Sequence, residues 1–273
     1  MTQASPLERI SVPARYPLEL LHRAPASDSG RRPPLLFIHG MGHGAWMWDE
    51  HWMPAASALG WDCWALSVRG HGESEGREAH CRSTLSSYAD DVMSAISVIG
   101  TSPVLVGHSM GARIIQKVSS VHTVPAMVYV APAPFGGGHY QLWMTLRNAP
   151  WDLARVLAGI PVQPERRHLV SDAVPRDRGN QLAARCQPGT TLNILQIMAP
   201  ASEPPAPCPT MLMAAGLDQV VAGRDFERTA RRFNSALKIY PNSGHDLMLD
   251  VGWEKALDDM LQWVEGAVAA PAA

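Results

Sequence analysis

The sequence lacks the features that mark nucleic-acid-binding and membrane-spanning proteins. Its net charge is −2 and its lysines and arginines form no long run, which argues against a nucleic-acid surface. No apolar stretch is long enough to span a bilayer. The first residues do not combine a basic start with an apolar run, as a signal peptide would. We therefore expect a soluble, cytoplasmic protein with no nucleic-acid partner and no membrane span.

Cysteine is also scarce. The chain has four cysteines, which are Cys63, Cys81, Cys186 and Cys208. They are widely spaced and form no CxxC pair, so a zinc site or a redox pair is not indicated. Free thiols in a reducing compartment are the expectation, and we predict neither a metal site nor a cofactor.

Apolar residues, by contrast, make up 46% of the 273 residues, enough for a large core. Short apolar runs alternate with longer amphipathic ones. The predicted strands are residues 34–38, 61–68, 103–106, 126–130, 210–215 and 236–240. The predicted helices are residues 46–59, 85–99, 109–120, 224–233 and 253–264. This alternation favours a mainly parallel sheet with helices on both faces, preceded by antiparallel strands at 10–12 and 18–22.

One region interrupts the alternation. Residues 139–200 follow a run of three glycines at 136–138 and end at a proline-rich stretch, 199–209. Proline and glycine at this density indicate a boundary. We predict that residues 139–200 form a helical lid inserted over the sheet, and that residues 1–138 and 201–273 form the core.

The segment Gly107-His108-Ser109-Met110-Gly111 fits the pattern G-x-S-x-G and lies between a predicted strand and a predicted helix. On such a sharp turn the serine occupies strained backbone, and side chains at the flanking glycines would collide with neighbouring elements. The helix N-terminus behind the serine favours developing negative charge. The pattern also occurs by chance in loops, but its position here predicts Ser109 as a nucleophile.

A serine hydroxyl needs a base, and the base needs an acid to orient it. Asp218 follows the predicted strand 210–215, and His245 follows the next strand, 236–240. Asp246 is adjacent to His245 and is poorly placed to reach the far nitrogen of its ring. We therefore predict His245 as general base and Asp218 as the orienting acid.

A glycine-rich turn follows the predicted strand 34–38, where the sequence reads His39-Gly40 and then MGHG. Such a loop can offer a backbone amide to an oxyanion, and the second amide is that of the residue after the nucleophile. The predicted donors are the N–H groups of Met41 and Met110, and His43 is a predicted substrate-binding residue. A phosphate-binding loop or a plain turn is the alternative, although the GKS/T of a nucleotide P-loop is absent.

These segments, with RGHGES at 69–74 and GHDLM at 244–248, resemble the α/β-hydrolase superfamily in type and in order. The resemblance implies an α/β fold with a mainly parallel eight-stranded sheet, helices on both faces and a small lid. It also implies a serine hydrolase whose triad runs in the order Ser109, Asp218, His245. Ala112 and Ala215 stand where the family frequently has glycine. The stretch HGMGHGAW is locally similar to plant methylesterases and hydroxynitrile lyases.

The expected reaction is hydrolysis of an apolar carboxylic ester, or of a thioester or lactone, through an acyl-enzyme on Ser109. The lid offers Trp143, Met144 and Trp151 as predicted substrate-binding residues. Alternatives within the fold are carbon–carbon bond hydrolysis, acyl transfer, cofactor-free oxygenation and cyanohydrin cleavage. A ligand-binding receptor with slow turnover is a further alternative. The expected partner is a small-molecule acyl substrate, and the sequence does not determine the oligomeric state.

Overall fold

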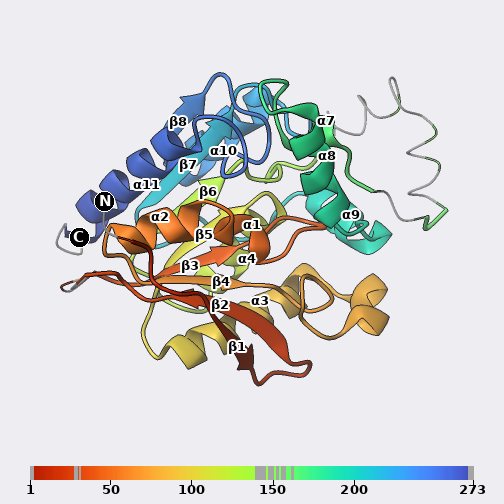
Figure 1. The fold of residues 1–273 in the computed structure, drawn as a ribbon. Helices are drawn as coiled ribbons and strands as arrows, with labels where there is room; N and C mark the ends of the chain where they lie inside the picture. The colour runs from red at the N-terminus through yellow and green to blue at the C-terminus, as the bar shows by residue number, and fades with distance from the viewer. Residues whose placement is uncertain are drawn as a thin grey trace.

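The computed structural model describes residues 3–27, 30, 32–138, 146, 151, 154, 158–160 and 163–269. Its centre is an eight-stranded sheet with the order β1-β2-β4-β3-β5-β6-β7-β8 (Figure 1). The strands are β1 (Glu8–Val12), β2 (Leu18–Arg23), β3 (Leu35–Ile38), β4 (Cys63–Leu66), β5 (Val104–His108), β6 (Met127–Val130), β7 (Thr210–Ala215) and β8 (Ala236–Tyr240). β1 and β2 pair antiparallel, β2 pairs antiparallel with β4, and every later pairing is parallel. The predicted fold class is confirmed.

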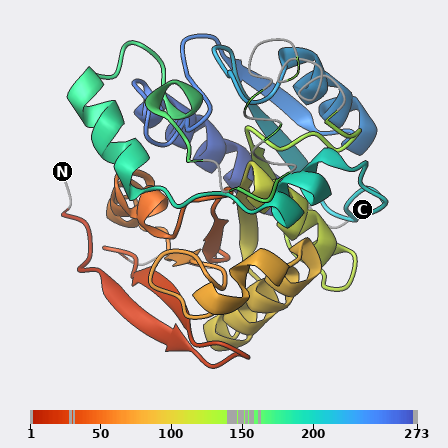
Figure 2. The same ribbon diagram turned by 90° about the vertical axis from the view of Figure 1, so that its right-hand side faces the viewer.

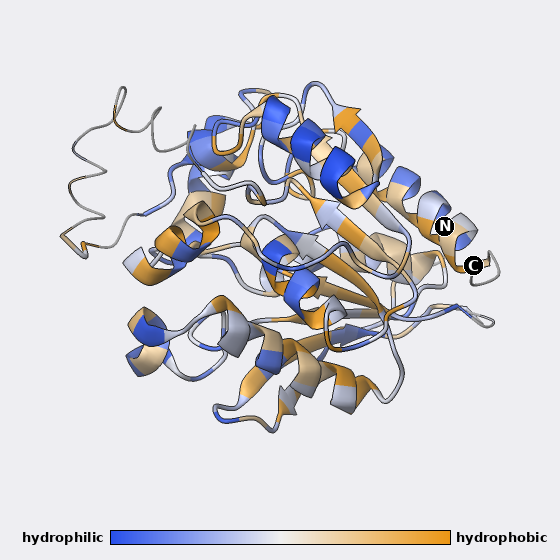
Figure 3. Ribbon diagram, turned by 180° about the vertical axis from the view of Figure 1, so that it is seen from behind, coloured by the Kyte–Doolittle hydropathy of each residue, from blue (hydrophilic) through white to orange (hydrophobic). Residues whose placement is uncertain are grey.

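Helices cover both faces of the sheet. They are α1 (Trp46–Asp49), α2 (Trp52–Ala58), α3 (Leu85–Ile99), α4 (Met110–Ser119), α7 (Arg166–Leu169), α8 (Arg176–Arg185), α9 (Thr191–Met198), α10 (Gly223–Phe233) and α11 (Trp253–Ala269), with a 3₁₀ turn, η1 (Arg77–Arg82). α2 packs against α11 on the face toward the viewer in Figure 1. α3 packs against α4 on the opposite face, which Figure 3 shows from behind. None of the described helices is both long and apolar enough to cross a bilayer.

The core lies along the central parallel strands. Every residue of β3, β5, β6 and β7 is buried. Because both faces of these strands are covered, their sequences are nearly continuous apolar runs rather than alternating ones. Figure 3 shows these strands as mainly hydrophobic, with polar residues on the outer sides of the helices.

The helix predicted at 46–59 is two helices in the structure. α1 ends at Asp49, and His51, with φ of −142°, separates it from α2. Pro54 explains the break, because it has no N–H to donate to the carbonyl of Glu50 and its ring clashes with that carbonyl. The prediction of one continuous helix at 46–59 is therefore wrong, and no pattern in the sequence indicated η1.

The described part of the lid lies beyond the carboxyl ends of the parallel strands. α7, α8 and α9 form a group at one end of the sheet in Figure 1. Figure 2 looks onto that end, where the chain from α8 to α9 crosses in front of the strands. The lid boundaries at 139 and 200 stay predictions, since most of residues 139–162 lie outside the described residues.

Candidate active site

Ser109 occupies the turn between β5 and α4. Its φ of 49° and ψ of −111° are strained for a residue with a side chain. The turn is held from the next strand, because the Ser109 N–H donates to the carbonyl of Val130 at 3.0 Å. The amide of Ala133 donates to the Ser109 carbonyl at 3.1 Å. The backbone strain is thus fixed by hydrogen bonds on both sides of the serine.

The two glycines of the turn permit the close packing that this geometry needs. A Cβ on Gly107 would lie 2.6 Å from the carbonyl oxygen of Gly111. A Cβ on Gly111 would lie 2.3 Å from the carbonyl oxygen of Ile38 in β3. Both contacts are with backbone rather than with a flexible side chain. Glycine at position 107 therefore lets β5 lie close to the first turn of α4, and glycine at position 111 lets α4 approach β3.

His245 and Asp218 follow β8 and β7, and their side chains meet. His245 Nδ1–H donates to Asp218 Oδ2 at 2.7 Å. The other carboxylate oxygen of Asp218 accepts from the amides of Val220 and Val221 at 2.7 and 2.8 Å. This fixes the carboxylate, and it leaves Nε2 as the ring nitrogen of His245 that can accept a proton.

The imidazole of His245 is buried among charges. Burial by itself lowers the pKa of His245, but the charge of Asp218, its hydrogen bond and the charge of Asp246 together raise the pKa above 6.5. The ring of His108, the residue before Ser109, lies with its centroid 4.7 Å from that of His245. The loop carrying the histidine therefore packs directly on the turn carrying the serine.

The glycine-rich turn after β3 lies against the same point. A Cβ on Gly40 would lie 3.1 Å from the Cβ of Ser109. The amide of His43 donates to the carbonyl of Gly40 at 3.2 Å and closes a turn. The N–H of Met41, inside the turn, takes no part in this hydrogen bond. Met110 is the first residue of α4, so its N–H has no partner within the helix. The two predicted oxyanion donors thus belong to the segments that border Ser109.

His39 holds the start of this turn. Its Nε2 accepts from the amide of Val68 at 3.1 Å, so Nδ1 carries the proton and donates to the Gly40 carbonyl at 2.7 Å. Burial lowers the pKa of His39 to about 3. The ring is therefore neutral at working pH and acts as a fixed brace.

His43, a predicted substrate-binding residue, lies buried in the turn after β3. Its side chain is 3% exposed, and its Nε2 lies 3.0 Å from Asp246 Oδ2. Its Nδ1 lies 3.1 Å from the Met41 carbonyl oxygen. His43 also borders a cavity of about 260 Å³, together with Trp46 and Arg185. A contact with substrate stays a prediction.

The other predicted substrate contacts come from the lid. Trp143 and Met144 lie outside the described residues. Trp151 is 82% exposed. The described lid touches the site elsewhere: the Leu169 carbonyl accepts from the amide of Asp246 at 2.7 Å, and the Gly42 carbonyl accepts from the amide of Gln187 at 2.6 Å.

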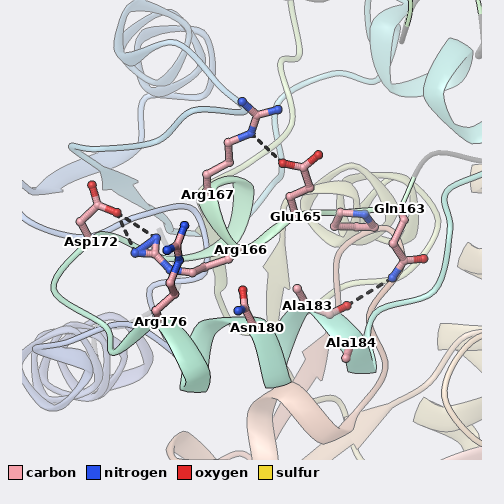
Figure 4. A pocket seen from close by; sticks show the side chains of 10 residues that line it. Gln163, Glu165, Arg166, Arg167, Asp172, Arg176, Asn180, Ala183 and Ala184 are labelled. Carbon is pink, nitrogen blue, oxygen red and sulfur yellow. Dashed lines mark hydrogen bonds and ion pairs between the residues drawn. The ribbon is translucent and has the colours of Figure 1, made fainter.

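A larger cavity, about 620 Å³, lies between α7 and α8, and none of the predicted triad lines it (Figure 4). Its arginines are partly paired. Arg166 donates to Asp172 Oδ1 at 2.7 and 2.8 Å, and Arg167 lies 3.0 Å from Glu165. Each of these two arginines thus pairs with a carboxylate of the lid itself.

One group of residues in the described part of the chain has metal-ligand spacing. The ligand atoms of His108, His245 and Asp246 all lie within 4.8 Å of one another. Asp246 already pairs with His43, and His245 with Asp218. We therefore treat these side chains as a hydrogen-bonded network and assign them no ion.

Asp246 was not predicted as the orienting acid, and no other role was predicted for it. The structure buries it completely beside His245. His108 and Cys186 also join this surrounding network, and neither was singled out. The only sequence signal for this network is the segment GHD at 244–246. A carboxylate next to a buried histidine is itself close to the core and must find a hydrogen-bond partner there.

The comparisons with known proteins agree with this architecture. The family described as "Alpha/beta hydrolase family" matches residues 35–258. The monoacylglycerol lipase of Mycolicibacterium smegmatis is 24% identical over 256 residues, which are 87% of this chain and 89% of that protein.

Solved structures give the same picture of the fold. A soluble variant of monoglyceride lipase from Saccharomyces cerevisiae, in complex with a substrate analog, superposes with a TM-score of 0.76 at 18% identity, covering 98% of this chain and 97% of the other. An esterase from Exiguobacterium antarcticum superposes with a TM-score of 0.69 at 18% identity, covering 92% and 96%.

Proposed function

This chain belongs to the alpha/beta hydrolase family, and we propose that it is a carboxylic ester hydrolase that works through an acyl-enzyme on Ser109. One observation carries the proposal: the loop of a histidine that is hydrogen-bonded to a buried carboxylate packs on the strained strand-to-helix turn that carries the serine. The esterase and monoacylglycerol lipase relatives support ester hydrolysis in general.

In the first half of the reaction His245 takes the proton of Ser109 as the hydroxyl attacks the ester carbonyl. Asp218 holds the ring in the required tautomer and stabilises its charged form. The amides of Met41 and Met110 bind the oxyanion of the tetrahedral intermediate. His245 then returns the proton to the leaving alcohol, and the acyl group remains on Ser109.

In the second half a water molecule gives its proton to His245 and attacks the acyl carbon. His245 then returns that proton to the oxygen of Ser109 as the bond between this oxygen and the acyl carbon breaks, which releases the acid and the free serine. The proposed substrate is a small apolar ester, in keeping with the apolar residues predicted in the lid. A contribution of Trp143, Met144 and Trp151 to the acyl pocket belongs to this proposal. A cytoplasmic location stays a prediction.

The test joins covalent labelling to turnover. A fluorophosphonate probe is expected to label Ser109 of the wild-type protein, and p-nitrophenyl esters of increasing chain length are expected to be hydrolysed. The variant Ser109→Ala is expected to lose labelling, and its kcat is expected to fall by about 10⁶, the loss seen when a triad serine is removed.

The matched control is Ser97→Ala, which removes the hydroxyl of an exposed serine on α3. It is expected to label and to turn over like the wild type. Near-wild-type turnover by folded Ser109→Ala would overturn the proposal. Labelling of Ser109 without turnover of any ester would favour a receptor or a different acyl chemistry.

A further inference from the structure

A second histidine–carboxylate pair lies buried beside the predicted triad. His43 Nε2 is 3.0 Å from Asp246 Oδ2, and the two side chains are 3% and 0% exposed. The other ring nitrogen of His43 is 3.1 Å from the carbonyl oxygen of Met41. A carboxylate and a carbonyl oxygen can only accept hydrogen bonds, so both ring nitrogens must donate. The geometry therefore requires an imidazolium at His43.

The charges of the pair support this protonation state. Burial lowers the pKa of His43, but the charge and hydrogen bond of Asp246 and those of Cys186 together raise it by more, and the pKa lies well above 6.5. Burial likewise raises the pKa of Asp246, but the charge and hydrogen bond of His43, with the charges of His108 and His245, together lower the pKa below its usual value. The two residues form an ion pair within the core.

The pair joins the segments that build the site. His43 belongs to the turn that carries the Met41 amide, and Asp246 directly follows His245. The lid reaches the same point, because Cys186, which follows α8, places its Sγ 3.5 Å from His43 Nε2. Asp250 adds a second link: it accepts from the amides of Gly244 and Ser171 at 2.6 Å.

The remaining groups around His245 are neutral or already assigned. His108 Nε2 lies 3.3 Å from the His245 carbonyl oxygen and 3.3 Å from Asp246 Oδ1. Burial and the neighbouring charge of His245 hold the pKa of His108 well below 6.5. The charges that face His245 are therefore those of Asp218, Asp246 and His43.

We infer that His43 and Asp246 are positioning residues that lock the oxyanion turn against the loop of the catalytic histidine. The inference rests on the proposed acyl-transfer function, because it assigns the pair a role in that same site. The His43 Nδ1–H fixes the peptide that follows Met41, and the Asp246 carboxylate anchors the ring from the other side. The pair thus keeps the oxyanion donor and the general base in fixed positions relative to each other.

The first test observes the wild-type protein by NMR, and a variant serves only to assign the signals. With ¹⁵N-labelled histidine, the two ring N–H signals of His43 are expected to be present together, and to persist as the pH is raised through 6.5 and above. They are assigned by their absence from His43→Asn. A His43 ring that loses a proton near 6.5, or that carries only one proton throughout, would overturn the inference.

The second test is kinetic. In Asp246→Asn the ring of His43 loses its counter-charge, so the ion pair is abolished. We expect kcat to fall with little change in KM, by less than the roughly 10²–10³-fold lost with a whole oxyanion donor. His43→Asn is expected to behave similarly, and the double variant should lose no more than the worse single one, because both substitutions break one unit. Losses that multiply in the double variant would contradict a pair.

The acid limb of the pH profile separates positioning from simple structural support. The charge of Asp246 raises the pKa of His245 more than the charge of His43 lowers it. Loss of the pair should therefore move the midpoint of kcat/KM to lower pH in Asp246→Asn. The matched control, Asp258→Asn, changes an exposed carboxylate on α11 and should leave kcat and the midpoint unchanged.

An unshifted midpoint and an unchanged kcat in folded Asp246→Asn would overturn the inference while leaving the proposed function intact. Failure of fluorophosphonate to label Ser109 in the wild type would instead contradict the proposed function. The histidine signals do not depend on substrate, so the two failures are distinguishable.

Discussion

At the scale of single residues, burial and neighbouring charges shift the pKa of His245 in opposite directions. Removal from water disfavours its charged form, while the carboxylates of Asp218 and Asp246 favour it. The outcome is a pKa above 6.5 for the predicted general base. Burial and two carboxylates thus tune one side chain in opposite directions.

The pH dependence of the wild-type enzyme follows from that direction. A general base must be neutral, so kcat/KM should fall as the pH drops through the raised pKa of His245. We expect the midpoint of the acid limb above 6.5, measured with a non-ionising ester substrate. The midpoint belongs to the coupled group of titrating residues rather than to His245 alone. A rate that stays flat to well below that pH would argue against a histidine base.

At the scale of elements, the packing of α4 on β3 depends on one missing side chain. A Cβ at Gly111 would lie 2.3 Å from the Ile38 carbonyl and 2.7 Å from that of His39. We expect Gly111→Ala to lower the free energy of unfolding by about 1–3 kcal/mol, as other overpacked sites do. Thermal unfolding followed by circular dichroism measures the loss.

Gly266 on α11 is the matched control for the same substitution. Nothing lies within 4 Å of a Cβ built there. Since alanine is the better helix former, Gly266→Ala should raise the free energy of unfolding by about 1 kcal/mol. The two changes are chemically identical, so a Gly111→Ala protein as stable as the wild type would show that the contact at Ile38 can relax.

Two arginines, the buried Arg113 and the exposed Arg232, hold the stem of the lid. Arg113 Nη1 donates to the carbonyls of Pro134, Ile197 and Ala199 at 2.8 to 3.3 Å. Arg232 donates to the carbonyl of Phe135 at 3.2 Å and to that of Ala201 at 2.7 Å.

The backbones of the two stem segments are also bonded, because the Ala201 amide donates to the Phe135 carbonyl at 2.8 Å. The two ends of the lid are therefore held together next to α4.

Above that stem, Trp151 presents an apolar surface that is 82% exposed. If the lid shapes the acyl pocket, Trp151→Ala should change the chain-length preference for p-nitrophenyl esters. An apolar pocket contact is worth about 1–3 kcal/mol, so shifts of roughly 10- to 200-fold are the upper scale. Labelling of Ser109 should change much less. Val121→Ala, at a side chain 76% exposed after α4, is the control and should leave the preference unchanged. An unaltered preference in Trp151→Ala would remove this residue from the pocket.

At the scale of the whole molecule, the sheet was foreseeable because its signals are local. A central parallel strand must be apolar on both faces, so β7 and β8 were predicted with the bounds that the structure gives them. The serine turn was foreseeable too, since its two glycines and its position between strand and helix lie within a few residues. The helix break at His51 was equally local, and reading Pro54 as a helix breaker would have found it.

What the sequence by itself determined is therefore the succession of elements and the identity of Ser109, Asp218 and His245 as candidates, each at the end of a strand. The tertiary structure alone decided how buried charges pair. His43 and Asp246 are 203 positions apart, and nothing local in either segment selects the other. Their pairing arises because the turns that follow β3 and β8, two strands that are not neighbours in the sheet, are buried together at the same edge. There a carboxylate removed from water is stable only beside a positive charge.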